Sequence, residues 1–194
     1  VLAILPGSRS AEVAYIAPPF FRAAALLHKT RPQLKMVVPA VPALHARIEQ
    51  IVAECGVRDM LQIVAGQSHA VLAACDCTLI ASGTATLEAA LFKRPMVIAY
   101  HMHPISWRLM QRKQLQPWVG LPNILCRDFV VPELLQDAAT PQALAQAVER
   151  WLDARTHDPA ALSALEQRFT ALHESLRRDT PRLAADAIQK ILSA

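Results

Sequence analysis

Five short, almost uninterrupted apolar runs constrain the fold of this sequence more than any other feature. They are VLAIL at 1–5, LKMVV at 34–38, LQIV at 61–64, CTLIA at 77–81 and MVIAY at 96–100. Runs of this length, rich in Val, Ile and Leu, are typical of strands that are buried on both faces. Segments with helical spacing separate them. This alternation predicts an α/β fold, a Rossmann-like parallel sheet with right-handed crossovers and helices on both faces.

Helices are expected between these strands and after them. The first two are predicted at about 11–31 and 42–55, because Pro32 and Gly56 follow them as helix stop signals. In a sheet of this kind, ligands bind beyond the carboxyl ends of the strands. The turns that lead from each strand into the next helix are therefore the first places to look for a site.

The C-terminal part departs from this alternation. Three helices are predicted at about 141–155, 159–178 and 182–193. In the second, large apolar side chains recur every three or four residues and form one narrow seam, which requires a partner surface. The residues of this seam are Leu162, Leu165, Phe169, Leu172 and Leu176. We therefore divide the chain into a Rossmann-like domain at 1–157 and a C-terminal helical extension at 158–194.

Composition narrows the classes of partner. With 194 residues and 53% hydrophobic content, the chain can form a folded core. Its net charge of +4 and pI near 9.1 suit a phosphate-bearing ligand or an acidic membrane surface. The charge falls short of the basic character of nucleic-acid-binding proteins, so no nucleic acid partner is expected. No apolar run is long enough for a transmembrane span, and we expect a soluble protein.

Cysteine and histidine spacing argues against a metal site. The cysteines lack the C-x-x-C spacing of zinc and redox motifs, so we expect buried free thiols in a reducing cytoplasm. They are Cys55, Cys75, Cys77 and Cys126. His101 and His103 are the only close pair of histidines, and no third ligand is in view. We predict neither a metal nor a cofactor.

Two of the five glycines stand at informative positions. Gly7 and Gly83 each follow an apolar run and precede a helical segment. A glycine there lets backbone N–H groups approach an anion, and a helix start carries about half a positive charge. Arg9 adds a planar donor suited to two-pronged phosphate contact. Both turns are candidate phosphate cradles. Alternatively, Gly7 only forms a turn and Arg9 is solvated.

The second turn also carries hydroxyl groups around its glycine, at Ser82, Thr84 and Thr86, and Glu88 follows. Glu88 stands outside the capping-box position for either Ser82 or Thr84. Its carboxylate could accept hydrogen bonds from both hydroxyls of a ribose while the turn binds a diphosphate. Alternatively, Glu88 is only stabilised by the helix dipole. Neither turn matches the G-x-G-x-x-G fingerprint or the P-loop, which disfavours a Rossmann dehydrogenase and a nucleoside triphosphatase.

Three longer motifs follow one another along the chain: LPGSRSAE at 5–12, ASGTATLEAALFKRPMVIAY at 81–100 and LPNILCRDFVVPELLQ at 121–136. Together and in this order, they resemble the C-terminal half of the lipid A disaccharide synthase family. The resemblance implies a GT-B glycosyltransferase, in which this half binds the UDP-sugar donor. It implies transfer of 2,3-diacylglucosamine from UDP-2,3-diacylglucosamine to 2,3-diacylglucosamine 1-phosphate, with release of UDP.

The resemblance also implies the site residues. Arg9 would stabilise the leaving diphosphate, Glu88 would lie near the ribose, and Glu12 matches the family without an assigned role. The substrate-binding positions carried over are Gly7, Ser8, Arg9, Ser82, Gly83, Thr84, Glu88, Asn123, Glu133 and Gln136. Alternatively, Asn123 is a turn residue after Pro122 and Gln136 lies on an exposed helix face.

The family resemblance further implies that an N-terminal half supplies the acceptor site and the general base. The chain is then a fragment that binds UDP weakly and does not turn over. Its C-terminal helices, 158–194, would pack on that absent half. The apolar seam would lack its partner, and self-association as a homodimer or by swapping is expected.

Residues 105–120 combine tryptophans and basic side chains, a composition found at membrane interfaces. With the resemblance, it suggests a cytoplasmic protein that is peripheral at the inner face of the cytoplasmic membrane. Alternatively, the segment is an ordinary surface helix anchored by an aromatic side chain.

Two other functions remain open from the sequence. One is a UDP-N-acetylglucosamine 2-epimerase or related UDP-sugar enzyme, which would need further acid and base groups, with His101 and His103 the only nearby candidates. The other is a non-catalytic module that binds nucleotide sugars.

Overall fold

A computed structural model describes residues 1–102, 106–109 and 116–193. In this part of the chain, six parallel strands form one sheet in the order β3-β2-β1-β4-β5-β6. The strands are β1 Leu2–Leu5, β2 Met36–Ala40, β3 Leu61–Ala65, β4 Cys77–Ala81, β5 Met96–Tyr100 and β6 Glu133–Leu135. All five strands expected from the apolar runs are confirmed. The sixth, β6, is an addition that the apolar pattern does not predict.

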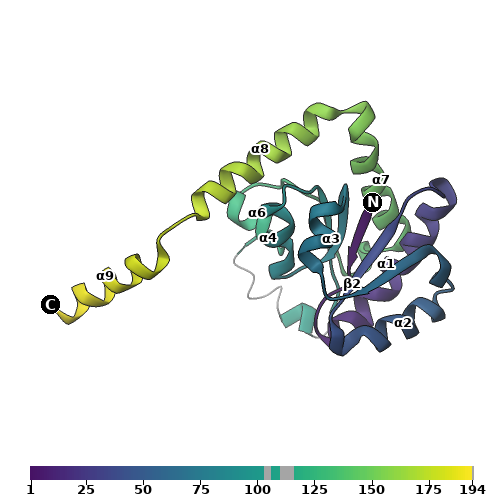
Figure 1. Ribbon diagram of the computed structural model, residues 1–194, viewed down its shortest axis with the longest axis horizontal. Helices are drawn as coiled ribbons and strands as arrows, with labels where there is room; N and C mark the ends of the chain where they lie inside the picture. The colour runs from purple at the N-terminus through teal and green to yellow at the C-terminus, as the bar shows by residue number, and fades with distance from the viewer. Residues whose placement is uncertain (103–105, 110–115, 194) are drawn as a thin grey trace.

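Helices cover both faces of this sheet, as predicted (Figure 1). They are α1 Ser10–Thr30, α2 His45–Glu54, α3 Ser68–Ala74, α4 Thr84–Leu91, α6 Leu121–Cys126, α7 Pro141–His157, α8 Pro159–Leu176 and α9 Thr180–Leu192. Alternate residues of the strands face opposite sides. Leu2 and Ile4 of β1 belong to a core shared with α1, α2 and α7. Ala3 and Leu5 belong to a second core, shared with α3, α4 and α8.

Helix α8 corrects one expectation. The predicted seam does have a partner within this chain, since Leu165, Phe169 and Leu172 are buried in the second core. In this core they join residues of α3, α4 and β5. Leu176 lies at the end of the seam and is 42% exposed. The prediction that the seam lacks a partner is therefore wrong for α8.

Helix α9 differs from α8. It extends away from the rest of the molecule (Figure 1), and its large apolar side chains are exposed. These are Leu183, Ile188, Ile191 and Leu192, with exposed fractions between 53% and 82%. For both α8 and α9, packing on another part of a longer protein stays a prediction. Within the described ranges, none of the helices combines the length and apolar composition that crossing a bilayer requires.

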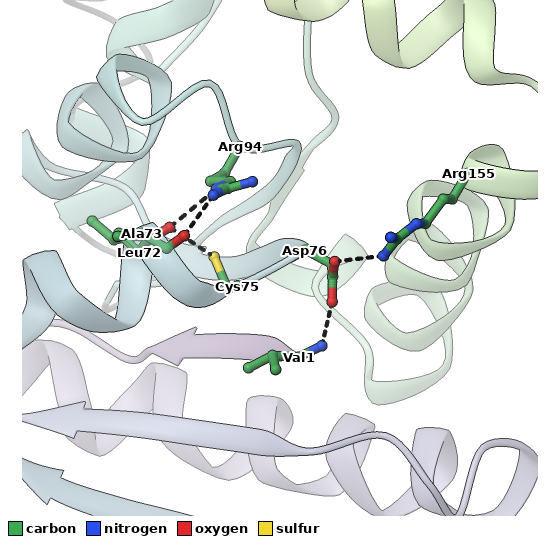
Figure 2. A network of polar contacts seen from close by, with 7 residues as sticks. All are labelled: Val1, Leu72, Ala73, Cys75, Asp76, Arg94 and Arg155. Atoms are coloured by element: carbon green, nitrogen blue, oxygen red, sulfur yellow. Dashed lines mark hydrogen bonds and ion pairs between the residues drawn. The ribbon is translucent and has the colours of Figure 1, made fainter.

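The amino-terminal edge of the sheet is fastened by a polar network (Figure 2). The Asp76 carboxylate, just before β4, pairs with Arg155 of α7 at 2.9 Å and with the amino group of Val1. Arg94, just before β5, donates to the carbonyls of Leu72 and Ala73 at the end of α3. These contacts fix α3 and α7 to the amino-terminal ends of β4 and β5. The glycine turns lie at the opposite, carboxyl-terminal ends of the strands.

Candidate functional site

The two glycine turns lie side by side at the carboxyl edge of the sheet. Strands β1 and β4 are neighbours, and Leu5 pairs with Ile80. Gly7 stands two residues beyond Leu5, and Gly83 stands three residues beyond Ile80. Strand order reverses between β1 and β4, and in open α/β sheets this switch point is where ligands bind. The structure thus brings the two predicted turns together.

A carboxylate of this chain, that of Glu12, already lies at the first turn. The Glu12 carboxylate folds back over the turn, and its Oε2 accepts a hydrogen bond from the Ser8 amide at 3.1 Å. A Cβ atom at Gly7 would come within 2.3 Å of that oxygen. Gly7, with φ of +111°, therefore allows the close approach of Glu12. The sequence left Glu12 without a role, and the structure places it over the turn.

Arg9 lies at the start of α1 in extended conformation and is exposed. Its positive charge affects the pKa of Tyr100, the last residue of β5. Burial raises the pKa of Tyr100, the nearby Glu12 carboxylate raises it further, and Arg9 lowers it in part. The charges of Arg9 and Glu12 therefore both act on the residue at the end of β5. In the described ranges no carboxylate forms an ion pair with Arg9, so its guanidinium can face a ligand.

The hydroxyl groups of the second turn have different roles. Ser82 Oγ donates to the Val119 carbonyl at 2.8 Å. Thr86 Oγ1 donates to the Gly83 carbonyl at 2.7 Å, which closes the first turn of α4. Gly83 and Thr84 are exposed. The backbone of Gly83 and the hydroxyl of Thr84 are thus the groups of this turn that can contact a ligand.

Glu88 stands four residues after Thr84, on the same face of α4. Its Oε2 lies 3.2 Å from Nε2 of His69, which comes from the first turn of α3. The side chain of Glu88 is 38% exposed, so part of the carboxylate is open to a ligand. Sequence reasoning missed His69. Its one signal is its place at the start of the helix after β3, at the same end of the strands as the glycine turns.

Asn123 is fully buried, and all of its hydrogen-bonding capacity is used inside the chain. Its Nδ2 donates to Val131 O at 2.9 Å and to Glu133 Oε1 at 2.8 Å. Its Oδ1 accepts from the amides of Val130 and Val131. The Asn123 side chain therefore supports the chain internally, and a ligand role for this residue stays a prediction. Because Asn123 lies inside α6, the alternative of a simple turn residue after Pro122 is not met.

Glu133 and Gln136 are also tied to the backbone. The Glu133 carboxylate accepts from the amides of Val119 at 2.8 Å and Gly120 at 2.9 Å. The Gln136 amide donates to Met102 O at 3.1 Å and accepts from Met102 N at 3.3 Å. Gln136 does not lie on an exposed helix face; it joins the end of β6 to the segment after β5. A ligand role for these two residues stays a prediction.

The residues considered for metal binding are placed as follows. The ring of His101 stacks on Tyr15, with centroids 5.6 Å apart, while His103 falls outside the described residues. Groups of three or more potential metal ligands do not occur in the part of the chain that is described. The four cysteines are free thiols, as predicted, but only Cys75 and Cys77 are buried, whereas Cys55 and Cys126 are half-buried. Burial raises the pKa of Cys75 to about 11, so this thiol is not a reactive thiolate near neutral pH.

A cavity lies away from the glycine turns, at the amino-terminal edge between α1, α7 and α8. Arginines contribute to its wall, but they are already bonded to this chain's own acceptors. Arg31 pairs with Asp153, Arg155 with Asp76, and Arg94 with two carbonyls. We therefore do not assign a site there.

Comparison with known proteins places the sequence in a family. It matches the family described as lipid-A-disaccharide synthetase over residues 1–188. The lipid-A-disaccharide synthase of Verminephrobacter eiseniae is 70% identical over 193 residues, covering 100% of this chain and 50% of the relative. That of Bordetella pertussis is 48% identical over 204 residues, covering 98% of this chain and 51% of the relative. The chain spans about half the length of the curated relatives it matches.

Solved structures share the fold at low sequence identity. WaaG, a glycosyltransferase involved in lipopolysaccharide biosynthesis, superposes with a TM-score of 0.61 at 17% identity, over 96% of this chain and 46% of WaaG. A UDP-N-acetylglucosamine 2-epimerase from Listeria monocytogenes gives 0.59 at 12% identity, over 86% of this chain and 39% of the epimerase. The predicted Rossmann-like α/β fold of GT-B glycosyltransferases is confirmed. Because the family match covers nearly the whole chain, the chain belongs to the lipid-A-disaccharide synthetase family.

Proposed function

We propose that this chain binds the UDP part of a nucleotide-sugar donor and stabilises the diphosphate as it leaves during glycosyl transfer. The observation that supports this most is the pair of glycine turns at the β1/β4 switch point, with Arg9 exposed beside them. The starts of α1 and α4 and the exposed Arg9 lie at the same end of these two neighbouring strands. Such donors favour a dianionic leaving group without a metal ion.

Each part of the donor has a candidate partner. The diphosphate would lie on the Gly83 turn and Arg9. The ribose would lie against Glu88, whose carboxylate is positioned by His69. By family membership, we propose that the sugar transferred is 2,3-diacylglucosamine, from its UDP derivative to 2,3-diacylglucosamine 1-phosphate.

The second half of the reaction requires a base. An acceptor hydroxyl must lose its proton as it attacks the sugar. We propose that the acceptor site and this base lie in the part of the family that this chain does not span, since its relatives are about twice as long. The isolated chain is then expected to bind UDP, but not to release UDP from UDP-2,3-diacylglucosamine when the acceptor is present. Turnover by the isolated chain would contradict this part of the proposal.

The epimerase alternative receives no specific support. Its fold is shared, but the fold likeness at 12% identity does not distinguish it from glycosyltransferases. Family membership favours the transferase.

We also propose that the protein is peripheral at the inner face of the cytoplasmic membrane. Leu109, which is 55% exposed, and the half-buried Trp107 support an interfacial role for the segment at 105–120. Much of that segment falls outside the described residues.

Calorimetric titration with UDP tests the donor site. Arg9→Ala removes a charge-assisted contact and should weaken UDP binding about tenfold or more. Glu88→Gln should weaken it less, because the amide keeps one acceptor. Arg58→Ala is a matched control, since Arg58 is an exposed arginine that pairs with Glu49 at the amino-terminal end of β3. If Arg9→Ala binds UDP as tightly as the parent chain and Arg58→Ala, the assignment is wrong.

A further inference from the structure

Val119 and Gly120 form a peptide segment that is held from two sides. From one side, the Glu133 carboxylate accepts both of their amide hydrogens, at 2.8 and 2.9 Å. From the other, Ser82 Oγ donates to the Val119 carbonyl at 2.8 Å. These contacts join residues that are 37 and 14 positions apart in the chain. We refer to Ser82, Val119, Gly120, Asn123 and Glu133 as the clamp.

Packing leaves the clamp little freedom. Gly120 is buried, and a Cβ atom there would come within 2.4 Å of Ile98 Cδ1 and 2.9 Å of Glu133 Oε1. The glycine is thus required for the segment to lie against both the sheet and the carboxylate. Asn123, fully buried, donates to Glu133 Oε1 and fixes its orientation.

Both oxygens of Glu133 are engaged by the chain. Oε1 accepts from Gly120 and Asn123, and Oε2 accepts from Val119. A carboxylate turned toward a diphosphate would repel it, whereas this one faces three donors of its own chain. The chemistry of Glu133 therefore fits internal support better than ligand contact.

The clamp ends at the second glycine turn. The Ser82 amide donates to Ala99 O of β5 at 2.9 Å, so its backbone is anchored to the sheet. Its hydroxyl is bonded to the Val119 carbonyl, and the next residue in the chain is Gly83. On the far side of Gly83, Thr86 donates to the Gly83 carbonyl. The position of the Gly83 amide thus depends on the clamp on one side and on α4 on the other.

We infer that Ser82, Asn123 and Glu133 are positioning residues, which set the affinity for a nucleoside diphosphate by holding the Gly83 turn without contacting the ligand through their side chains. This inference rests on the proposed function. It changes the role of three residues that the family resemblance assigns to substrate binding.

A double-mutant cycle on UDP affinity tests this inference. Ser82→Ala and Glu133→Gln should each weaken UDP binding about tenfold, because each releases the Val119–Gly120 segment. If both residues act through that segment, the double variant should bind UDP about as tightly as the single variant with the lower affinity. Ser82→Thr, which keeps a hydroxyl, should restore affinity. Ser175→Ala and Glu49→Gln are matched controls, because both side chains lie on helices away from the turns.

Selective ¹⁵N-glycine labelling gives a second readout, because the chain has only five glycines. Without ligand, Glu133→Gln should move the Gly120 signal, which loses its bond to a carboxylate, and also the Gly83 signal. The signal of Gly56, which follows α2, should not move. Ser82→Ala, which removes one hydroxyl from a half-buried residue, should move the same two signals and keeps the test available if Glu133→Gln does not fold.

Losses that multiply in the double variant would overturn the inference, because Ser82 and Glu133 would then act independently. An unmoved Gly83 signal in both single variants would also overturn it, since the clamp would not reach the turn. The proposed function fails separately, if the parent chain does not bind UDP or if Arg9→Ala leaves its affinity unchanged.

Discussion

The Glu12 carboxylate lies where a phosphate ligand of the first turn would bind. It accepts the Ser8 amide at 3.1 Å and covers Gly7. A diphosphate on this turn must displace it, or bind beside it against charge repulsion. At the scale of single residues, Glu12 is therefore a side chain whose replacement should increase the affinity for UDP.

Glu12→Gln should tighten UDP binding several-fold, because the amide oxygen keeps the hydrogen bond to Ser8 while the like charge is lost. Titration calorimetry at two salt concentrations measures this. The gain should shrink at high salt, since screening weakens the repulsion in the parent. Weaker binding by Glu12→Gln would mean that the carboxylate contacts the ligand favourably.

At the scale of elements, α8 is part of this chain's own core. Phe169 is fully buried and packs with Leu165 and Leu172 over the face of the sheet that α4 covers. The helix is capped by Asp158, whose side chain accepts the Ala161 amide at 3.1 Å. α8 therefore contributes to the hydrophobic core of this chain.

Phe169→Ala should lower the free energy of unfolding by about 3 to 5 kcal/mol, through lost burial and a cavity. Leu176→Ala, on the same helix but 42% exposed, should cost less than about 1 kcal/mol. Urea denaturation of both variants measures the difference. Equal small effects would show that α8 does not belong to the core.

At the scale of the whole molecule, α9 carries several large apolar side chains that the described residues do not cover. Its exposed side chains recur on one stripe, with Leu183, Ile188 and Ile191 among them. A stripe of this kind is expected to associate with another apolar surface, in a second copy or in a longer protein.

The isolated chain should therefore self-associate as its concentration rises, and a double variant Ile188→Lys, Ile191→Lys should shift it toward monomer. Sedimentation velocity measures the distribution. Gln189→Lys adds a charge to the same helix without removing apolar area and should leave association unchanged. A parent chain that stays monomeric at high concentration would contradict this prediction.

The elements that local pattern predicted and those that it missed differ in a physical way. Strands β1, β4 and β5 are buried on both faces, so their apolar runs are visible in the sequence. Strand β6 has three residues, all only half-buried, and its hydrogen bonds to β5 come from tertiary pairing. The predicted strand at 34–38 lies at 36–40 instead, because the register is set by pairing with β1 and β3.

The sequence by itself determined the class of fold, the two glycine turns and the family. Each follows from a local feature of the sequence. The apolar runs indicate strands buried on both faces, the glycines indicate tight turns, and the three sequence motifs indicate the family. Only the tertiary structure decided that Glu12 covers Gly7, that His69 meets Glu88 and that Glu133 holds Gly120. It also decided that α8 packs on its own sheet. The reason is that hydrogen-bond partners and core contacts depend on which segments the folded chain brings together. The separation of two residues along the sequence does not determine their distance in space.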